Sequence, residues 1–213
     1  MPDDGCAGTT GGYPSDCELT EALRARAMLR NKPVARSAAW LTALPRAKSV
    51  QLLLLDVDGV LTDGSIIYGT GGSEVKSFNT QDGLGIWLLQ ESGVAVGIIT
   101  ARTSEAVTRR AQDLHIRHIY QGKSDKLIVF EEILKETGLR PPQVAYMGDD
   151  WLDLPILNRV GFAAAPANAV PEIRQRVHYT AECSGGRGAV REICDLILEA
   201  RGQLDRMRAK FDR

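Results

Sequence analysis

Two carboxylates stand where they could share one reaction or one metal ion. Asp56 and Asp58 follow a short apolar run, residues 50–55, and are two positions apart. Side chains two positions apart on a regular strand point the same way, so both carboxylates would face one site. Their charges repel at that separation, and a divalent cation would relieve the repulsion. Gly59 permits a sharp turn directly afterwards, so the pair alone is equally compatible with a simple acidic turn.

A hydroxyl and a lysine come at comparable places further along the chain. Thr100 ends a second apolar run, 95–100, where its hydroxyl could cap a helix or bind an anion. Lys126 stands at the start of a predicted helix, where its charge opposes the helix dipole by about 0.3–1 kcal/mol unless an anion lies nearby. Lys123 is a rival for that position. Each residue alone also has an ordinary structural explanation.

A second acidic group follows the apolar run 144–148. Asp149 comes directly after this run, Asp150 is next, and Asp153 follows one helical turn later. The carboxyl ends of parallel strands meet at one edge of a sheet, so these acids would lie near Asp56. Acids at two strand ends, with a hydroxyl and a lysine between them in the chain, are far more specific than any single element. The combination predicts a metal-dependent phosphate site.

The elements that must position these residues alternate between strand and helix. Short, continuously apolar runs are typical of strands buried on both faces of a parallel sheet, and helical patterns with good capping residues separate them. This alternation predicts an α/β, Rossmann-like fold with a parallel sheet flanked by helices. The predicted strands are 50–55, 95–100, 144–148, 162–165 and 178–180, and the predicted helices are 83–91, 104–113, 126–137, 152–158 and 189–207.

One segment interrupts the alternation directly after the first strand. Residues 65–68 and 74–78 have strand-like composition and flank a glycine-rich turn, 69–72. Such a turn predicts a β-hairpin, which we place within 63–82. The hairpin would project from the carboxyl edge of the sheet, where ligands bind in open parallel sheets.

The first part of the chain differs in character from the rest. We predict an N-terminal extension over residues 1–48 and a single globular domain over 49–213. Residues 1–14 are expected to be disordered, because they contain few large apolar residues. Ser15 and Glu18 have capping-box spacing and predict a helix that ends near Arg30. The remainder of the extension is predicted to be a linker or a short surface helix.

Composition excludes several classes of function. The 213 residues carry a formal net charge of −1, so we expect no nucleic-acid partner and no binding to an anionic membrane. No apolar run approaches the roughly 18–20 residues that a membrane span needs, and the polar start does not resemble a secretory signal. The four cysteines have no zinc-ligand spacing with one another or with the histidines. These features predict a cytoplasmic protein with reduced thiols.

The combined motifs resemble those of the haloacid dehalogenase superfamily of phosphohydrolases. Two further segments, Phe78 to Ile86 and Gly185 to Asp195, narrow the resemblance to a branch without a cap domain, whose substrate is 3-deoxy-D-manno-octulosonate 8-phosphate. The resemblance covers about Ser49 to the end of the C-terminal helix. It departs at Ala101, where the family usually has glycine before Arg102. The residues that match the superfamily pattern are Asp56, Asp58, Thr62, Thr100, Lys126, Asp149 and Asp153.

The resemblance implies a mechanism and a cofactor. Asp56 would attack phosphorus to give an aspartyl-phosphate, and Asp58 would protonate the leaving oxygen and then activate water. Mg²⁺ would be held by the Asp56 carboxylate, the backbone carbonyl of Asp58 and Asp149. Thr100 and Lys126 would bind the remaining phosphate oxygens.

Other residues receive supporting or substrate-binding roles from the same resemblance. Arg102 and Arg187 could bind the carboxylate or phosphate of the substrate, since guanidinium forks suit both. Asp153 would orient Lys126. Asp150 is left open between an outer metal shell and a helix N-cap. The expected supporting residues are Asp82, Asp150 and Asp153.

The resemblance also implies assembly and a pathway. Four subunits would associate through their hairpins, and each would contribute to a neighbouring pocket in place of a cap. The segment Gly185–Gly188 would be a mobile tail that reaches a neighbouring active site; a loop before a helix is its simpler explanation. The product would serve lipopolysaccharide precursor synthesis.

Three alternatives remain open at the level of sequence. A related nonulosonate 9-phosphate differs from the expected substrate mainly in length and stereochemistry. A receiver-like phospho-acceptor module also combines acids, a threonine and a lysine, but Asp58 would be unwanted beside a stable phosphoryl group. A catalytically silent sugar-phosphate-binding module is the third alternative. A P-loop is excluded, because Lys123 would need a glycine at the position of Arg117.

Overall fold

The computed structural model describes residues 14–30 and 35–211. The disorder expected for residues 1–14 therefore falls almost wholly outside the described residues. The chain divides into two compact units, Met1–Ser37 and Ala38–Arg213. Nothing in the described ranges combines the helix length and apolar character needed to cross a membrane.

In the first unit, helix α1 spans Asp16–Arg30. The backbone N–H of Ser15 donates to Glu18 Oε2 at 2.8 Å, and the Glu18 N–H donates to Ser15 Oγ at 3.3 Å. This reciprocal pair is a capping box, which satisfies two of the otherwise unpaired donors at the helix start. Leu19 and Leu23 are exposed on this helix.

The second unit is built on a six-stranded parallel sheet with strand order β5-β4-β1-β6-β7-β8. The predicted α/β fold is confirmed. Strand β5 was not predicted, because its three residues follow a helix without a continuous apolar run. The strands are β1 (Leu52–Leu55), β4 (Ala95–Ile99), β5 (His118–Tyr120), β6 (Val144–Met147), β7 (Phe162–Ala165) and β8 (Tyr179–Thr180).

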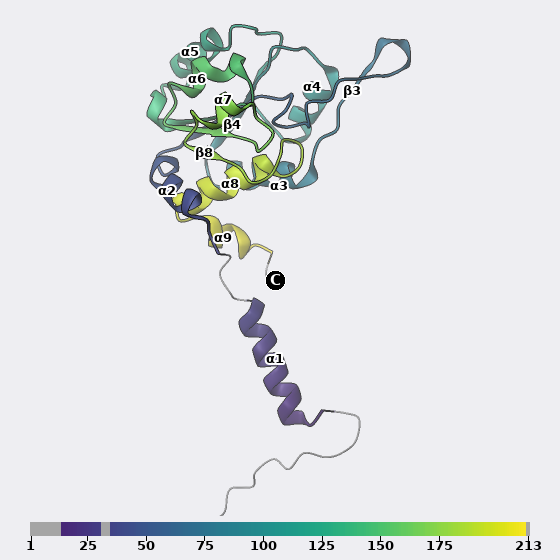
Figure 1. Cartoon of the computed structure of the whole chain (residues 1–213), viewed down its shortest axis with the longest axis vertical. Coiled ribbons are helices and arrows are strands. Elements are labelled where there is room, and N and C mark those ends of the chain that lie inside the picture. Colours follow the sequence, from purple (N-terminus) through teal and green to yellow (C-terminus); the bar gives the residue numbers. More distant parts are fainter. Residues whose placement is uncertain (1–13, 31–34, 212–213) are drawn as a thin grey trace, which may run out of the picture. The chain divides into compact units, whose positions relative to one another are not determined.

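Helices cover both faces of this sheet (Figure 1). All four residues of β1 are buried, with Leu53 and Leu55 in one core cluster and Leu52 and Leu54 in the other. This division follows from the two-residue period of a strand. Packed on the first face are α2 (Ala38–Ala47), α3 (Thr80–Glu91), α4 (Glu105–Asp113), α8 (Ala189–Ala200) and α9 (Leu204–Arg208); on the second are α5 (Lys126–Thr137), α6 (Leu154–Leu157) and α7 (Pro171–Arg174).

Helix α2 is the short helix that was one of the two predictions for this stretch, and one side of it packs into the core. Trp40, Ala43 and Ala47 on its inner side are buried and belong to the core of the second unit. The compact unit therefore begins at Ala38, about ten residues before the predicted start at 49. The alanine-rich sequence hid this, since small residues give a weak apolar pattern even when one face is fully buried.

The C-terminal helix, predicted as one element over 189–207, is two helices. Helix α8 ends at Ala200, and α9 begins at Leu204. Gly202 between them has φ +68°, a conformation that glycine adopts without a steric penalty and that a continuous helix cannot contain. Helix α8 packs chiefly against α3.

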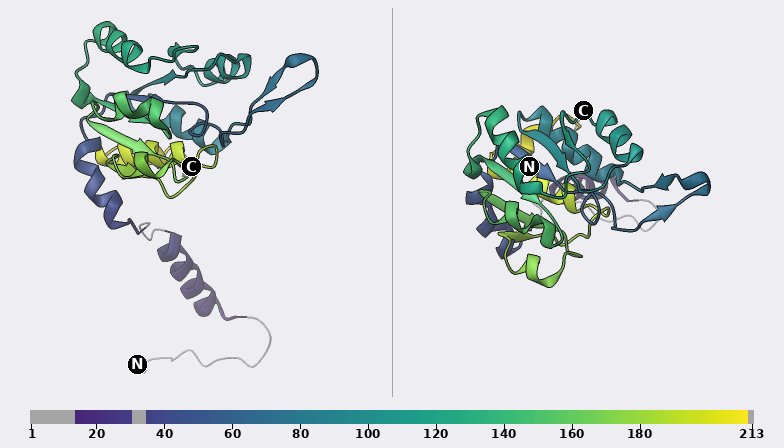
Figure 2. Two further views of the ribbon diagram at one scale, coloured as in Figure 1. Left: turned by 45° about the horizontal axis from the view of Figure 1, so that its top comes forward. Right: turned by 90° about the horizontal axis from the view of Figure 1, so that it is seen from above.

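The predicted hairpin is present as β2 (Ile67–Tyr68) and β3 (Glu74–Val75), which pair antiparallel. Figure 2 shows it projecting from the rest of the second unit. The hairpin is the only insertion between β1 and α3, so no cap domain lies there in the described chain. Helix α3 begins at Thr80 rather than near 83, because the Asn79 side chain accepts hydrogen bonds from the first turn.

Candidate active site

The loop after β1 turns sharply at the carboxyl edge of the sheet. The backbone N–H of Asp56 still bonds to the Met147 carbonyl of β6 at 3.0 Å, which holds Asp56 at the end of the strand. The chain then makes a tight turn in which Leu61 and Thr62 both donate to the Val57 carbonyl. Asp56 is buried as a result, with 8% of its surface exposed.

A buried lysine links two of the predicted acids. Lys126 Nζ lies 2.9 Å from Asp56 Oδ1 and 2.7 Å from Asp153 Oδ1. Lys126 is 3% exposed, whereas its rival Lys123 is exposed. The start of α5 therefore turns Lys126, and not Lys123, into the site. The carboxylates of Asp56 and Asp153 offset both the unfavourable helix dipole and the cost of burying this charge.

Asp153 is held by four donors. Its Oδ1 accepts from Lys126 and from the Tyr146 hydroxyl at 2.6 Å, and its Oδ2 accepts from the backbone N–H groups of Asp149 and Asp150 at 2.9 and 3.2 Å. Tyr146 is fully buried, and burial together with the charge of Asp153 raises its pKa well above the usual value. It therefore remains a protonated donor. The tyrosine lies in a predicted strand, but its polar contact with Asp153 was not predicted.

Three carboxylates converge at this edge. Oxygen atoms of Asp56, Asp149 and Asp153 lie within 4.8 Å of one another. Burial raises the pKa of Asp56 to about 6, against the opposing charge of Lys126. Burial, followed by the charges of Asp56 and Asp153, raises the pKa of Asp149 to about 7. The cluster thus carries more negative charge than one lysine can balance, which suits it to a divalent cation.

The side chain of Asp150 makes the helix N-cap contact that was one of its two expected roles. Its side chain accepts from the Trp151 N–H at 2.7 Å and caps the short helix Trp151–Asp153. The side chain is on the exposed side of the loop, while its backbone N–H contacts Asp153. The structure therefore gives Asp150 a capping contact.

Thr100 lies at the same edge, one strand away. It follows β4, is 3% exposed, and its backbone N–H bonds to the Tyr120 carbonyl of β5 at 2.9 Å. Its Oγ1 accepts from the Arg102 N–H at 3.4 Å, so the hydroxyl faces the loop that follows β4. Ala101 in this loop leaves that hydrogen bond in place.

The hairpin brings Lys76 to Asp58 and Glu74 to Lys76, and neither of these charged residues was predicted as part of the site. Lys76 Nζ contacts Asp58 Oδ1 and lies 3.1 Å from Glu74 Oε1. Arg102 Nε lies 3.7 Å from Asp58 Oδ2, and Arg102 Nη2 donates to Glu74 Oε1 at 3.0 Å. The signal was available in part, because Glu74 and Lys76 are two positions apart on a strand and share one face.

The glycine-rich segment before α8 packs against the loop after β1 of the same chain. Gly185 N–H donates to Asn168 Oδ1 at 2.6 Å, and Asn168 Nδ2 donates to the Gly59 carbonyl at 3.1 Å. Gly186 N–H bonds to the Val60 carbonyl at 3.0 Å. A side chain at Gly185 would collide with the backbone of Gly59. This packing supports the simpler explanation of the segment, and Asn168 was not predicted.

Two predicted residues lie in or next to this glycine-rich segment. Arg187 is part of it, and Asp82 contacts helix α8, which follows it. Asp82 is 1% exposed on α3, and its Oδ1 accepts from the Arg191 N–H at 2.8 Å. Burial raises its pKa, against hydrogen bonds from the first turn of α8. Asp82 thus anchors α8 and lies outside the acidic cluster. Arg187 is exposed, and its charge acts on Asp63.

Gly59 is required where the loop passes Asp149. Its φ is +90°, and a methyl group built on it would lie 2.1 Å from Asp149 Oδ2. We expect Gly59→Ala to displace Asp149 and to lower activity about 100-fold, since misplacements near 1 Å can have that effect. Gly138→Ala is the matched control, because Gly138 has φ +68° with no atom near its added methyl group.

Both variants should lose stability through their backbone conformation, by on the order of 1 kcal/mol. Thermal unfolding and phosphate release, measured on the same samples, separate the two effects. Equal activity of the Gly59 and Gly138 variants would contradict the close approach to Asp149.

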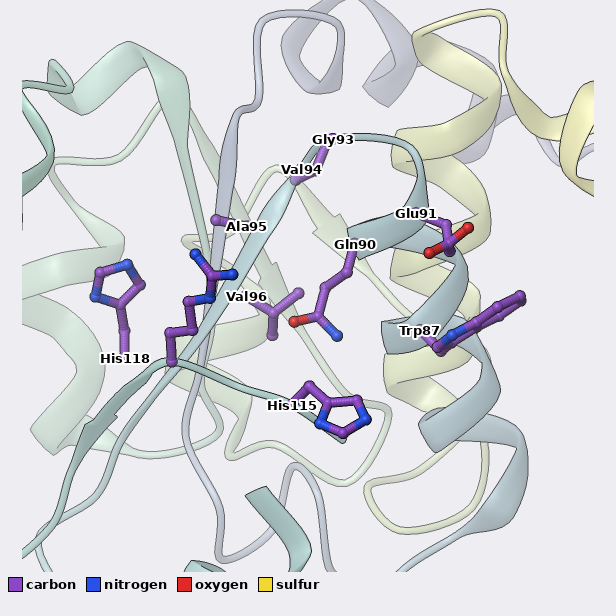
Figure 3. Close-up of a pocket in the computed structure, with 10 residues that line it drawn as sticks. Trp87, Gln90, Glu91, Gly93, Val94, Ala95, Val96, His115 and His118 are labelled. Carbon is purple, nitrogen blue, oxygen red and sulfur yellow. The ribbon is translucent and has the colours of Figure 1, made fainter. Parts of the chain in front are cut away.

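A separate cavity of about 440 Å³ lies at the opposite edge of the sheet (Figure 3). It opens where α3 ends and β4 begins, and it contains neither the acidic cluster nor Lys126. Gln90 on its wall is already bonded to the Leu114 carbonyl at 2.9 Å. The expected chemistry therefore belongs to the carboxyl edge. The cavity is lined by Trp87, Gln90, Glu91, Gly93, Val94, Ala95, Val96, His115, Arg117 and His118.

Comparison with known proteins identifies the family of the chain. Residues 103–193 match the model of a haloacid dehalogenase-like hydrolase family. The 3-deoxy-D-manno-octulosonate 8-phosphate phosphatase of Escherichia coli K12 is 47% identical over 162 residues, which are 76% of this chain and 86% of that protein. The phosphatase of the same name from Yersinia pestis is 47% identical over the same length of chain.

Solved structures give the same relationship. The Y. pestis phosphatase superposes with a TM-score of 0.76 at 46% identity, covering 77% of this chain and 89% of that one. The Moraxella catarrhalis phosphatase, solved with a magnesium ion, a phosphate ion and KDO, superposes with a TM-score of 0.78 at 43% identity, covering 79% and 97%. The chain therefore belongs to the haloacid dehalogenase-like hydrolases, in the family of the 3-deoxy-D-manno-octulosonate 8-phosphate phosphatases.

Proposed function

We propose that this protein hydrolyses 3-deoxy-D-manno-octulosonate 8-phosphate to the free sugar acid and phosphate. The observation that carries the proposal is the buried ion pair of Lys126 with Asp56, placed beside Asp149 at the carboxyl edge of the sheet. An acid, a buried cation and a second acid at one edge can bind a phosphoryl group and attack it. The names of the relatives supply the substrate.

The acidic cluster fits Mg²⁺. Asp153 has both oxygens engaged by four donors, so the oxygens of Asp56 and Asp149 are the better ligands. Burial is the main cause of their raised pKa values, so the ionised carboxylates are poorly solvated here and gain from a cation bound beside them. We assign Asp56, Asp149 and the backbone carbonyl of Asp58 as the protein ligands. A bound Mg²⁺ supplies positive charge that offsets repulsion between Asp56 and the phosphate dianion.

The reaction proceeds in two displacements. An oxygen of Asp56 forms a bond to phosphorus as the bond to the sugar oxygen breaks, and Asp58 gives its proton to that oxygen. Asp58, now a carboxylate, takes a proton from water, whose oxygen attacks phosphorus and releases Asp56. The same group serves both steps because each reverses its protonation state.

The remaining site residues bind and orient the phosphoryl group and the sugar acid. Lys126, fixed by Asp153, and the Thr100 hydroxyl donate to phosphate oxygens and stabilise developing charge. Arg102, 40% exposed in its side chain at the mouth of the site, can receive the carboxylate of the sugar acid. Arg187 is a second candidate for that carboxylate.

The proposal also includes the assembly of the enzyme and its location in the cell. The exposed hairpin carries Ile67, Tyr68 and Val75 with half or more of their surface accessible. We propose that four subunits associate through these hairpins and complete one another's pockets, because no cap lies over the site in the described chain. The enzyme would act in the cytoplasm, in lipopolysaccharide precursor synthesis.

Phosphate release from a panel of sugar-acid phosphates, with and without Mg²⁺, tests this function. We expect Mg²⁺-dependent turnover that is at least about tenfold more efficient on the eight-carbon phosphate than on a nonulosonate 9-phosphate. A reversed preference would assign the nine-carbon substrate. Absence of metal-dependent turnover on every member would contradict the proposal. Light scattering of the same sample measures the assembly.

A further inference from the structure

One lysine of the hairpin has a side chain that is shielded from solvent, unlike the residue before it. The side chain of Lys76, directly after β3, is only 1% exposed, although Val75 beside it is 51% exposed. Burying an ammonium group is unfavourable unless it is paired, and a buried lysine also loses much of its rotamer freedom. An apolar residue would anchor the hairpin with neither penalty. A lysine at this position is therefore better explained by the interaction of its charge than by packing.

That charge is directed at Asp58. Lys76 Nζ contacts Asp58 Oδ1, while Arg102 Nε lies 3.7 Å from the other oxygen of the same carboxylate. Each oxygen of Asp58 thus faces its own cation. The side chain of Asp58 remains 21% exposed, so it is held without being closed off from the site.

Glu74 completes the arrangement. Its Oε1 lies 3.1 Å from Lys76 Nζ and 3.0 Å from Arg102 Nη2, so one carboxylate holds both cations. Whenever Asp58 is a carboxylate, two positive and two negative groups balance, which reduces the penalty for shielding them from water. Lys76 has the smallest exposure of the four side chains and is the one that fixes the hairpin directly to Asp58.

We propose that Lys76 is a positioning residue for leaving-group protonation: it holds the Asp58 carboxyl on the hairpin side of the phosphoryl site, where the sugar oxygen departs. This inference rests on the proposed function. In the step concerned, the bond from phosphorus to the sugar oxygen breaks as the bond from Asp56 forms. The proton of Asp58 moves to the sugar oxygen, and Asp58 is left as a carboxylate that Lys76 still contacts.

Two classes of phosphate ester separate this role from a structural one. A sugar or other alkyl phosphate releases a strongly basic oxygen that needs a proton, whereas 4-nitrophenyl phosphate releases a phenolate that does not. We expect Lys76→Met to lower kcat/KM about 10- to 100-fold for alkyl phosphates, as part of the usual contribution of a general acid. We expect less than about threefold loss for the aryl ester. The constant kcat/KM reports only the steps up to departure of the leaving group, and a phenolate departs without needing the proton of Asp58.

Three variants complete the experiment. Lys76→Arg should recover most of the activity on alkyl phosphates, because it keeps the charge. Adding Lys76→Met to Asp58→Asn should cause little further loss, since the lysine acts through the aspartate. Lys135→Met, on the exposed side of α5, is the matched control and should leave both esters unaffected.

The outcomes are distinct. Equal losses on the two ester classes, or additive losses in the double variant, would overturn the positioning role. If the unaltered protein fails on sugar-acid phosphates but hydrolyses simpler alkyl phosphates, the proposed substrate is contradicted. The comparison of alkyl with aryl esters still decides the role of Lys76 in that case.

Discussion

Asp56→Asn is expected to lower kcat by on the order of 10⁵-fold, as removal of a covalent nucleophile does in other enzymes. Asparagine has almost the same shape, and its carbonyl oxygen can accept the hydrogen bond that Lys126 Nζ makes to Asp56 at 2.9 Å. The amide cannot form an acyl phosphate that water then hydrolyses. Phosphate release over long incubations measures the residual rate, and mass spectrometry after acid quench detects phosphorylated Asp56 only in the unaltered protein.

The fold should survive this change. Burial and the charge of Asp153 raise the pKa of Asp56, so an ionised Asp56 opposes folding at neutral pH when no metal is bound. A neutral amide removes that opposition, and we expect the metal-free variant to unfold at a temperature no lower than the metal-free unaltered protein. Full activity of Asp56→Asn would refute the nucleophile assignment. Lost activity together with lost structure would instead point to a packing defect.

Much of the fold was predictable, because the sheet is buried on both faces. Continuous apolar runs such as 52–55 are typical of strands inside a parallel sheet, and two of these runs lead directly to a polar residue at the carboxyl edge. The placement of Asp56 and Thr100 at this edge was predicted in this way. Strand β5 was missed because all three of its residues are half-buried at the edge of the sheet, which gives no apolar run.

The side-chain partners within the site were harder to predict. Tyr146 stands inside an apolar strand, and nothing in its neighbours indicates that its hydroxyl bonds to Asp153. Lys76 reaches Asp58 only because the hairpin folds back over the loop, which is a contact across 18 positions in the chain. Such contacts depend on tertiary geometry, whereas strand ends depend on local pattern.

Removing the metal is the second large effect that we expect. Chelation by EDTA should abolish measurable turnover, and added Mg²⁺ should restore it, because Asp56 and Asp149 then regain a counter-charge. The same ion should also stabilise the fold. In its absence, the buried Asp56 and the half-buried Asp149 bind protons more tightly in the folded than in the unfolded chain, with pKa values of about 6 and about 7.

The sign of the pH dependence follows from these raised values. The stability that protonation of Asp56 and Asp149 gives the metal-free protein is fully present below their unfolded pKa, near 3.8, and is lost as pH rises through about 6 and about 7. Mg²⁺ needs the carboxylates without their protons, so its binding weakens as pH falls. The increase in unfolding temperature on adding Mg²⁺ should therefore be small at about pH 5 and large at about pH 8.

Thermal unfolding scans with and without Mg²⁺ across this range measure that increment. The increment is the useful quantity, because carboxylates elsewhere change the absolute stability of both samples equally. In Asp149→Asn the increment should be small at every pH, since one ligand is gone and the remaining cluster carries less charge. An increment that is constant between about pH 5 and about pH 8 would show that Mg²⁺ does not displace protons from Asp56 and Asp149, and would remove these two residues from the metal site.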